Sequence, residues 1–478
     1  MNFQDTQLIG LTARADQHAA RLSDLLSGLI TQFTQRGHRL YLVGGSVRDA
    51  LLDRLGHDLD FTTDARPEVV KEILDGWAET VWDTGIDFGT VSAVYKGQQI
   101  EITTFRADTY DGKSRNPEVV YGDTLEGDLI RRDFKVNAMA IEFTGDGGRE
   151  FHDPLDGLAD LAAGVMDTPD RPEISFHDDP LRMLRAARFA AQLDFSVAQR
   201  VQDAMADMAG EIQRITVERV QVELDKLICG AHPEVGIDLL TDTGIFEFIF
   251  PEIPGMRMAQ DEHAQHKDVY RHSLTVMRQA IDQEEHGPDL VLRWAALLHD
   301  CGKPATRAFT DGRVSFHHHE VVGAKLVRKR LRALKYPKAT IEQVSQLVYL
   351  HMRFHGFGEG QWTDSAVRRY VTDAGDLLPR LHKLVRADCT TRNAKKARRL
   401  QRTYDHLMER IEEIAAKEDL ARVRPDLDGN EIMEILDLKP GPDVGRAWAF
   451  LKELRLEEGP LDREVAIEKL RAWWEANK

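Results

Sequence analysis

Apolar and polar positions in the first part of this chain follow two periods, one typical of strands and one typical of helices. Four short segments with apolar runs or alternating residues predict strands at 39–43, 58–63, 90–95 and 99–105. Two longer segments repeat their apolar residues at helical spacing, at 8–36 and 66–77. Pro67 stands near the start of the second, where proline suits a helix. This part of the chain therefore predicts a mixed sheet with helices.

The rest of the chain has helical spacing almost throughout. Within residues 177–193 a helix is predicted that starts with an acidic cap and has Pro180 at its first helical position. Further helices are predicted at residues 216–228, around residues 294–300, and over most of residues 400–478. We therefore predict an α+β fold in which a small mixed head precedes a mostly helical neck, body and tail. The expected segments are an N-terminal helix at 1–37, the head at 38–166, the neck at 167–258, a second helical domain at 259–400 and the tail at 401–478.

Composition narrows the class of protein. A chain of 478 residues is long enough for about three or four domains, and 42% hydrophobic residues is ordinary for a globular protein. No apolar run is long enough to span a membrane, and the N-terminus lacks the pattern of a secretory signal. The three cysteines are scattered and form no metal-binding motif. These features predict a cytoplasmic protein in a reducing compartment.

Positive charge is clustered, although the net charge is −17. Residues 325–338 hold seven cations and no acid, and residues 392–402 hold six cations. Such patches in an acidic chain favour a local site for a polyanion such as RNA over a general nucleic-acid coat. The alternative is two solvated helix faces. The candidate RNA contacts in the second patch are Lys395, Lys396, Arg398 and Arg399.

A Gly-Gly turn and two aspartates follow the first predicted strand. Without a Cβ, the backbone of Gly44 and Gly45 can lie against a bulky anion, and the short helix after them points free N–H groups to the same place. Asp58 and Asp60 are two apart on the next strand, so their carboxylates project from one face and repel unless a cation separates them. Carboxylate oxygens suit Mg²⁺. A phosphate cradle beside Mg²⁺ is what nucleotidyl transfer needs.

Other interpretations of this segment are weaker. It is not a P-loop, because no Gly-Lys-Ser/Thr follows, and it lacks the third glycine of a dinucleotide-binding turn. A tight turn with a solvated acidic strand end is the structural alternative. Glu101 on a later predicted strand would either add a third carboxylate or be exposed, and the pattern favours exposure. Residues 106–117 are polar and predict a mobile loop that suits a site that opens and closes.

Gly-Gly-x-Val-Arg-Asp followed by Asp-x-Asp resembles the signature of the polymerase-β-like nucleotidyltransferases. It is most similar to the class that contains bacterial CCA-adding enzymes and poly(A) polymerases. Two later segments resemble further motifs of that class, Arg-Arg-Asp-Phe-x-x-Asn-Ala-Met-Ala at 131–140 and Asp-x-x-Arg-x-x-Arg-x-x-Arg at 179–188. The resemblance covers residues 38–230 and implies a nucleotidyltransferase head.

The resemblance also implies roles for individual residues. Asp58 and Asp60 would be catalytic and would hold Mg²⁺. Gly45, Arg48 and Arg132 would position the triphosphate, for which a guanidinium is suited. Asp179 and Arg182 would select the incoming base, and Arg185 and Arg188 would brace this pair or contact the nucleotide. An amphipathic helix capped by Asp179 is the structural alternative for the last motif.

A third region contains scattered histidines and aspartates. His299 and Asp300 end an apolar helix before Gly302 and Pro304, and an adjacent imidazole and carboxylate can share one divalent metal. The order His272, His299-Asp300, Asp388 resembles an HD phosphohydrolase domain, which implies a second metal site at these four residues. Five further histidines lie between them and can assist, at positions 317, 318, 319, 351 and 355. A helical domain whose metal site is vestigial is the alternative.

Together these resemblances imply template-independent addition of C, C and A to the 3′ end of tRNA from CTP and ATP, with Mg²⁺ as cofactor. A poly(A) polymerase shares the head motifs and stays open as an alternative. A second alternative, a phosphohydrolase of the HD type, would leave the head motifs unexplained. A third, a non-catalytic nucleotide sensor, would not need both aspartates, Asp58 and Asp60. We expect tRNA, CTP and ATP as partners and no membrane association.

Overall fold

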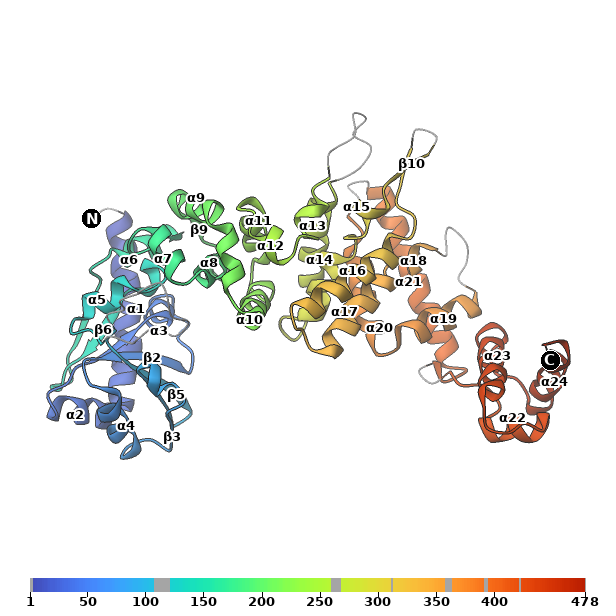
Figure 1. Ribbon diagram of the computed structural model, residues 1–478, viewed down its shortest axis with the longest axis horizontal. Coiled ribbons are helices and arrows are strands. Elements are labelled where there is room, and N and C mark those ends of the chain that lie inside the picture. Colours follow the sequence, from blue (N-terminus) through green and yellow to red (C-terminus); the bar gives the residue numbers. More distant parts are fainter. Residues whose placement is uncertain are drawn as a thin grey trace. The chain divides into compact units, whose positions relative to one another are not determined.

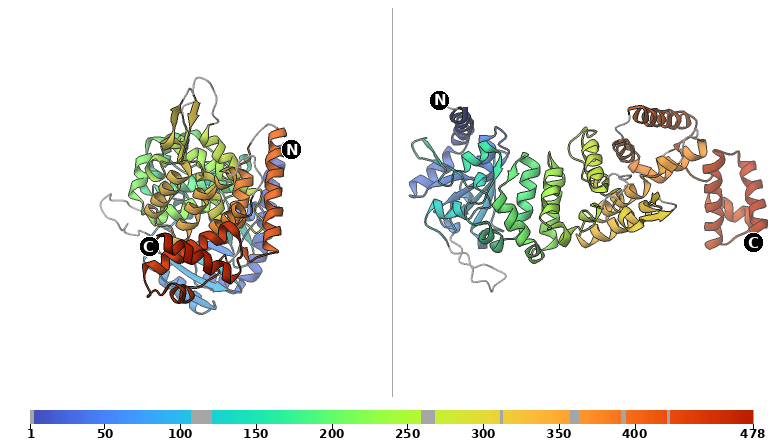
Figure 2. Two further views of the ribbon diagram at one scale, coloured as in Figure 1. Left: turned by 90° about the vertical axis from the view of Figure 1, so that its right-hand side faces the viewer. Right: turned by 90° about the horizontal axis from the view of Figure 1, so that it is seen from above.

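The computed structural model describes residues 3–106, 121–258, 268–310, 313–356, 363–390, 394–420 and 423–477. The chain divides into two compact units, Met1–Ile249 and Phe250–Lys478, and each is described by itself. The first contains a mixed sheet with helices and the second is almost entirely helical (Figures 1 and 2). The predicted α+β fold is therefore confirmed.

The sheet of the first unit has seven strands in the order β3-β4-β5-β2-β1-β6-β7. Its strands are β1 Leu40–Val43, β2 Asp58–Thr63, β3 Thr80–Trp82, β4 Thr90–Tyr95, β5 Gln98–Thr104, β6 Ala140–Phe143 and β7 Arg149–His152. Among the described strands of this sheet, only β2 and β5 pair in parallel, and their register places Asp60 opposite Glu101. The four predicted strands are present, with boundaries shifted by one residue where they differ.

Helices cover this sheet and precede it. They are α1 Phe3–Leu25, α2 Ser27–Gln35, α3 Gly45–Leu51, α4 Pro67–Asp75, α5 Leu125–Ile130 and α6 Gly157–Ala163. The single helix predicted over residues 8–36 is wrong in one respect, because it is interrupted at Leu26. The bonds from Leu26 N to Leu22 O and from Ile30 N to Leu26 O persist at 2.8 and 2.9 Å, so the interruption is a local kink. It lies beside Ser27 and Gly28, both poorer helix formers than alanine.

The remainder of the first unit is helical. It comprises α7 Pro172–Asp178, α8 Leu181–Leu193, α9 Gln199–Asp207, α10 Val217–Ile228, α11 Pro233–Asp242 and α12 Phe246–Ile249, with the short pair β8 Val165–Met166 and β9 Ser196–Val197. The helix predicted to follow the acidic cap is present as α8 and begins one residue after Pro180, whereas α7, which ends just before Asp179, was not predicted. Proline lacks the N–H that a continuous helix would need there. A Cβ on Gly236 would lie 2.5 Å from the carbonyl oxygen of Ala187, so glycine lets α11 approach α8 closely.

After the 3-10 turn Pro254–Met256, thirteen helical segments and one hairpin of the second unit lie within the described residues. They are α13 Val269–Ile281, α14 Leu290–Leu298, α15 Lys303–Thr306, β10 Ala308–Thr310, β11 Arg313–Ser315, α16 His319–Ala333, α17 Lys338–Leu350, α18 Arg353–Gly356, α19 Asp364–Ala374, the 3-10 turn Gly375–Leu377, α20 Leu378–Ala387, α21 Ala394–Ala415, α22 Gly429–Leu436, α23 Pro442–Glu458 and α24 Arg463–Asn477. Helix α14 is buried along its length, and its Trp294 stacks on Phe250 with ring centroids 5.2 Å apart. The hairpin was not predicted.

The last three helices have a small core of their own. Leu427, Ile432, Ala447, Leu451, Ala466 and Leu470 form it. Phe450 and Trp473 stack at its border with centroids 4.7 Å apart. The predicted start of the tail at residue 401 falls inside α21. Among the described residues, no helix is both long enough and apolar enough to cross a membrane.

Candidate active site

The Gly-Gly turn joins β1 to α3 at the edge of a pocket in the first unit. Gly44 has φ of +68°, which glycine adopts at little cost. A Cβ there would lie 2.9 Å from Nη1 of Arg132 and 3.7 Å from Oδ2 of Asp60, so the turn requires glycine for space as well. The Ser46 hydroxyl donates to the Asp58 carbonyl at 3.3 Å and accepts from the Asp60 N–H at 3.0 Å. The turn is thereby tied to the strand that carries both aspartates.

Three carboxylates share one face of β2 and β5, and two of them, Asp60 and Glu101, line the pocket. Asp58 and Asp60 are exposed alternate residues of β2, and Glu101 of β5 lies beside Asp60. Loss of water in the pocket raises the pKa of Asp60, and the charges of Glu101 and Asp58 add to the rise while Arg132 opposes it. Asp60 keeps exposed surface because the pocket is open. Oxygen donors that repel one another in this way fit Mg²⁺. The expectation that Glu101 is an exposed strand residue is wrong, because the parallel pairing of β2 with β5 brings it to the site.

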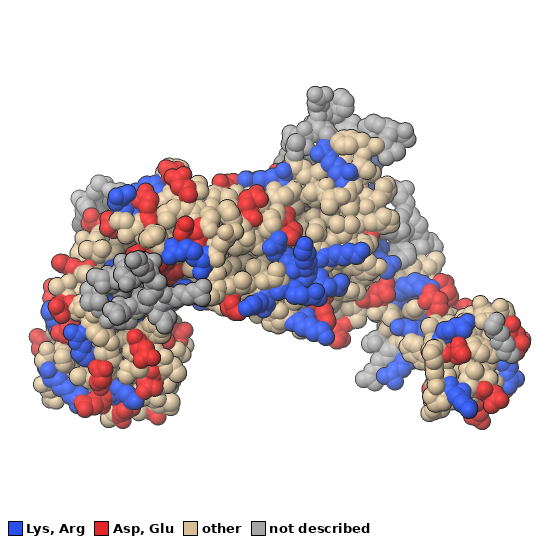
Figure 3. Space-filling view, viewed as in Figure 1, with Lys and Arg blue, Asp and Glu red and all other residues tan. Residues whose placement is uncertain are grey.

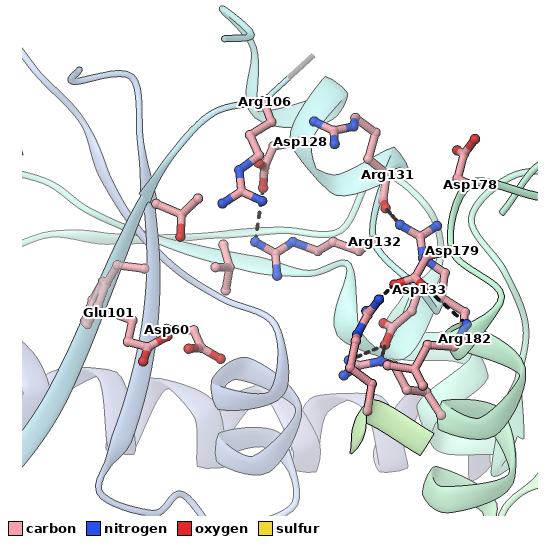
Figure 4. Close-up of a pocket in the computed structure, with 16 residues that line it drawn as sticks. Asp60, Glu101, Arg106, Asp128, Arg131, Arg132, Asp133, Asp178, Asp179 and Arg182 are labelled. Atoms are coloured by element: carbon pink, nitrogen blue, oxygen red, sulfur yellow. Dashed lines mark hydrogen bonds and ion pairs between the residues drawn. The ribbon is translucent and has the colours of Figure 1, made fainter. Parts of the chain in front are cut away.

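The pocket has a volume of about 530 Å³, within the range of small-molecule sites. Figure 4 shows Asp60 and Glu101 on one side and Asp179 and Arg182 on the other, with the Arg132 guanidinium between them. The remaining lining residues come from β1, β2 and β5, from the segment around α5, and from α7, α8 and α10. They are Val43, Phe61, Thr103, Arg106, Asp128, Arg131, Asp133, Asp178, Leu181, Arg185 and Arg219.

Several guanidinium groups crowd one part of this pocket. Burial lowers the pKa of Arg131 to about 10, and the nearby positive charges of Arg106, Arg182 and Arg132 contribute. Burial likewise lowers the pKa of Arg106. Nη2 of Arg132 donates to Asp128 at 3.1 Å. Mutually repelling cations beside carboxylates are suited to a polyphosphate that would bind together with a metal ion.

Asp179 and Arg182 both line the pocket and both have partners in the protein. Asp179 Oδ1 accepts from the Leu181 N–H at 3.1 Å, and Oδ2 accepts from Nη2 of Arg219 at 2.8 Å. Arg182 donates to the Ser175 hydroxyl at 2.8 Å and to the Arg131 carbonyl at 2.7 Å. The pair is therefore held in place at the pocket wall. Sequence reasoning missed Arg219, and only its position beside Asp179 reveals it.

Residues from all three motifs meet in one buried network. Nη1 of Arg48 donates to Asn137 Oδ1 at 2.7 Å, and Asn137 Nδ2 donates to Asp133 Oδ1 at 3.0 Å. Nε of Arg185 donates to the other oxygen of Asp133 at 2.7 Å. Burial alone would raise the pKa of Asp133, but Arg185 and Asn137 outweigh it and lower that pKa. The network ties α3 to α8 behind the pocket.

Two predicted nucleotide-binding residues occupy the interior of the unit and do not line the pocket. Arg48 is 7% exposed and stands 4.9 Å from the centroid of the Phe189 ring. Arg188 pairs with Glu223 of α10 at 2.7 Å and lies 4.1 Å from the same ring. Gly45 begins α3, next to Gly44 at the pocket edge. The structure therefore places Arg48 and Arg188 where they stabilise the elements that carry the pocket residues.

The second unit brings the four predicted metal ligands together. His272 Nε2 lies 3.0 Å from Asp388 Oδ1 and 3.5 Å from Asp300 Oδ2. His299 Nε2 lies 3.2 Å from Asp300 Oδ2 and 3.3 Å from His272 Nε2. Burial disfavours the charged form of His299, yet Asp300 and Asp388 outweigh burial and raise its pKa to about 9. These nitrogen and oxygen donors fit one divalent metal.

The neighbouring histidines divide into two groups. His319 and His351 are buried beside Asp300, whereas His317 and His318 are exposed. The side chains of His355 and Lys396, and the predicted loop beyond Arg106, lie outside what the structure describes.

Basic side chains gather over α16 and α17 on the face of the second unit that Figure 3 shows. Four exposed residues of α16 contribute, at positions Lys325, Arg328, Lys329 and Arg332. Their spacing of three and four residues places them on one side of the helix. In the second patch, Lys395, Arg398 and Arg399 are exposed on α21.

Three family models match this chain. Residues 40–167 match the poly A polymerase head domain, residues 194–256 match the probable RNA and SrmB-binding site of polymerase A, and residues 269–393 match the HD domain. These matches contain the head motifs and the histidine cluster, although the Asp179 motif falls between the first two.

Among curated proteins, the chain is similar to the A-adding tRNA nucleotidyltransferase of Deinococcus radiodurans. The two are 33% identical over 424 residues, which cover 87% of this chain and 91% of that protein. The chain is also similar to the CCA-adding enzyme of Enterococcus faecalis. The two are 39% identical over 221 residues, which cover 46% of this chain and 52% of that protein. The match thus spans about half the length of that relative, and of the similar enzyme from Lactobacillus helveticus.

The fold is similar to that of solved structures as well. The crystal structure of the Bacillus stearothermophilus CCA-adding enzyme in complex with CTP has a TM-score of 0.66, with 24% identity over 95% of this chain and 99% of that chain. At this level of identity the likeness establishes the fold.

Proposed function

Since this chain belongs to the class II nucleotidyltransferase family of CCA-adding and A-adding enzymes, we propose that it adds C, C and A to the 3′ end of tRNA. CTP and ATP are the substrates, pyrophosphate is the product, and no nucleic-acid template is used. The observation that carries the proposal is a single pocket that joins Asp60 and Glu101 to several arginines and to Asp179 and Arg182.

In the transfer itself, the terminal ribose oxygen of tRNA forms a bond to the α-phosphorus and the bond to pyrophosphate breaks. Asp58, Asp60 and Glu101 are the residues that would hold Mg²⁺. Magnesium supplies charge neutralisation on the triphosphate and favours ionisation of the attacking hydroxyl. Arg132, which lies between the carboxylates and Asp179, and Arg131 hold the phosphates by charge-assisted hydrogen bonds.

Base selection follows from hydrogen-bond polarity at Asp179 and Arg182. Cytosine and adenine each present an amino donor beside a ring-nitrogen acceptor, whereas guanine and uracil present a carbonyl acceptor beside an N–H donor. A carboxylate only accepts and a guanidinium only donates. The pair therefore matches C and A and leaves two unmatched contacts with G and U. A site built around such bonds can discriminate by about 10⁴-fold.

The deciding experiment uses tRNA that lacks its 3′ CCA and tRNA that already ends in CC, each incubated with each NTP alone and with CTP plus ATP. Addition of C, C and A that then stops supports the proposal. Incorporation of A alone, and only on tRNA that already ends in CC, would make the protein an A-adding enzyme like the relative from Deinococcus radiodurans. Long A tracts would make it a poly(A) polymerase.

For tRNA contact outside the pocket, we propose the basic residues of α21. Changing Lys395, Arg398 and Arg399 to glutamate, together with Lys396 from the same patch of the sequence, would remove the contacts to tRNA phosphates. The KM for tRNA should then rise and its salt dependence flatten, with little change in the KM for CTP. An unchanged tRNA KM assigns this patch to an ordinary solvated face.

A second candidate function belongs to the second unit. The cluster of His272, His299, Asp300 and Asp388 favours a metal-dependent phosphohydrolase of the HD type, and a bound metal supplies Lewis-acid activation of phosphate esters. Asp300→Ala should remove hydrolysis of p-nitrophenyl phosphate and bis-p-nitrophenyl phosphate and spare nucleotide addition. If the wild type hydrolyses neither ester under several divalent metals, the site is vestigial.

A further inference from the structure

The sheet face that carries the carboxylates of the candidate active site continues across two further strands. Asp60 of β2 lies opposite Glu101 of β5 in the register. Glu101 lies opposite Ser92 of β4, and Ser92 lies opposite Trp82 of β3. Residues directly opposite one another on paired strands project from the same face. Trp82 therefore ends a row that begins at the carboxylates, on the outermost described strand on this side of the sheet.

The two faces of these strands differ in polarity. The residues of β4 and β5 on the other face are apolar and fully buried; they are Val91, Ala93, Ile100 and Ile102. Helix α4 packs against β3, β4 and β5, and the burial of this apolar set shows which face it covers. On the carboxylate face, Asp58, Gln99 and Thr80 are exposed and Trp82 is partly exposed. This face is therefore a polar surface with one large aromatic residue on it.

The nucleotide pocket borders this surface. Thr103 lines the pocket, and its hydroxyl oxygen lies 2.9 Å from that of Thr90 on β4. Arg106 also lines the pocket, and its Nη2 donates to the same Thr90 hydroxyl at 3.1 Å. The pocket wall thus reaches β4. A ligand that extends from the carboxylates away from β2 crosses β4 and then meets Trp82.

The strand order assigns the two substrates to opposite sides of the carboxylates. Strand β1 and the Gly44 turn lie on one side of β2, whereas β5, β4 and β3 lie on the other. A Cβ on Gly44 would lie 2.9 Å from Nη1 of Arg132, and Figure 4 shows Asp179 across the pocket from Glu101. The proposed triphosphate and base contacts are therefore on the β1 side. Because the attacking oxygen and the leaving pyrophosphate lie roughly in line, the RNA end approaches from the side of β5.

We infer that Trp82 stacks on a base at the 3′ end of the bound tRNA and so positions the terminal ribose at the carboxylates. Neighbouring strands lie about 4.8 Å apart, so the backbone of Trp82 is roughly 10 Å from that of Glu101, with the small Ser92 between them. An aromatic ring stacks on any base, which suits an RNA end whose last base changes as nucleotides are added. The inference rests on the proposed tRNA nucleotidyltransferase function and names a contact for its RNA substrate.

The test is kinetic and uses the full-length protein with ATP, Mg²⁺ and tRNA that ends in CC, because CCA-adding and A-adding enzymes both complete this step. Trp82→Leu keeps an apolar side chain but loses the aromatic face, so kcat/KM for the tRNA should fall by about 5- to 100-fold. The KM for ATP should stay within about twofold, since the contact is made to the RNA alone. Trp82→Phe keeps a stacking face and should retain most of the wild-type kcat/KM.

Trp448→Leu is the matched control, because it alters an exposed tryptophan of the second unit, and it should behave as wild type. A wild-type value of kcat/KM in Trp82→Leu would overturn the inference. An equal loss in Trp82→Leu and Trp82→Phe would do the same, since a stacking contact tolerates phenylalanine. So would an equal rise in the KM for ATP and for tRNA, which would show damage to the head as a whole.

A second measurement uses the wild type and covers the case in which the variants do not fold. A tRNA whose terminal C is replaced by 4-thiouridine is bound without nucleotide and irradiated, and the crosslinked peptides are identified by mass spectrometry. The peptide that contains Trp82 should carry a crosslink, and absence of this crosslink would overturn the inference. A crosslink at Trp82 without nucleotide transfer would uphold this inference and refute the proposed function, whereas transfer without that crosslink would do the reverse.

Discussion

Replacing Arg48 by alanine tests whether this arginine stabilises the head or binds the triphosphate. The family resemblance implies a triphosphate contact. In the structure, however, Arg48 is buried, with Nη1 donating to Asn137 at 2.7 Å and Nη2 to Asp49 at 2.9 Å. The two roles predict opposite patterns of stability and kinetics.

The expected loss of stability follows from these contacts. Asn137 is 4% exposed, and loss of the donor to its oxygen costs about 1–3 kcal/mol. Loss of the guanidinium beside Phe189, 4.9 Å from the ring centroid, costs about 0.5–2 kcal/mol. Asp49 retains Arg54 at 3.1 Å, so it adds little. A total of about 3 kcal/mol lowers the melting temperature of a unit of this size by about 6–12 °C.

Calorimetry of the full-length protein measures this change, and steady-state kinetics well below melting measures the KM for CTP and ATP. We expect the melting temperature of Arg48→Ala to fall while both KM values stay within about threefold, since no bound phosphate loses a partner. Arg54→Ala is the control, because this exposed arginine shares Asp49 but should cost at most about 0.5 kcal/mol. An unchanged melting temperature with a KM raised more than about tenfold would show that Arg48 binds the nucleotide, since one charge-assisted hydrogen bond is worth that much.

Three further predictions concern the head and the basic surface. Asp60→Asn should abolish transfer and Glu101→Gln should lower kcat by about 10²–10³, because each removes negative charge from the Mg²⁺ site. Primer-extension assays measure both effects, and near-normal activity of either variant contradicts the role of that residue. Asp179→Ala should slow use of CTP and ATP and erode rejection of UTP, as kcat/KM values for each NTP will show; full rates with intact rejection would leave Asp179 as a helix cap only. Lys325→Glu/Lys329→Glu should raise the KM for tRNA and reduce its salt dependence without changing the KM for CTP, and an equal effect on both substrates would argue against RNA contact on α16.

Much of the fold was predictable because its signals are local. The strands at 58–63 and 90–95 and the helix after Pro67 depend on periodicity and on residues close in the sequence, and the structure has them. Pro180 was predicted as the first residue of its helix and instead directly precedes Leu181, because a proline before a helix and a proline in its first turn have the same local pattern. The hairpin at β10 and β11 was missed, since each strand has only three residues.

The candidate site shows the same division between local and long-range information. Asp58 and Asp60 share a face because strand residues alternate, so the sequence alone determined their common direction. Glu101 joins them only because β5 pairs in parallel with β2, and Arg219 reaches Asp179 only because α10 packs on α8. Neither contact can be inferred from the residues that are adjacent in the sequence.

The sequence by itself determined which reactive side chains this chain has, since the motifs identify the carboxylates, arginines and histidines and their order. Tertiary structure alone decided which of them touch. It placed Arg48 in a buried network and brought His319 and His351 to Asp300. The physical reason is that a side chain's direction follows from its own helix or strand, whereas its partners follow from packing between elements far apart in the chain.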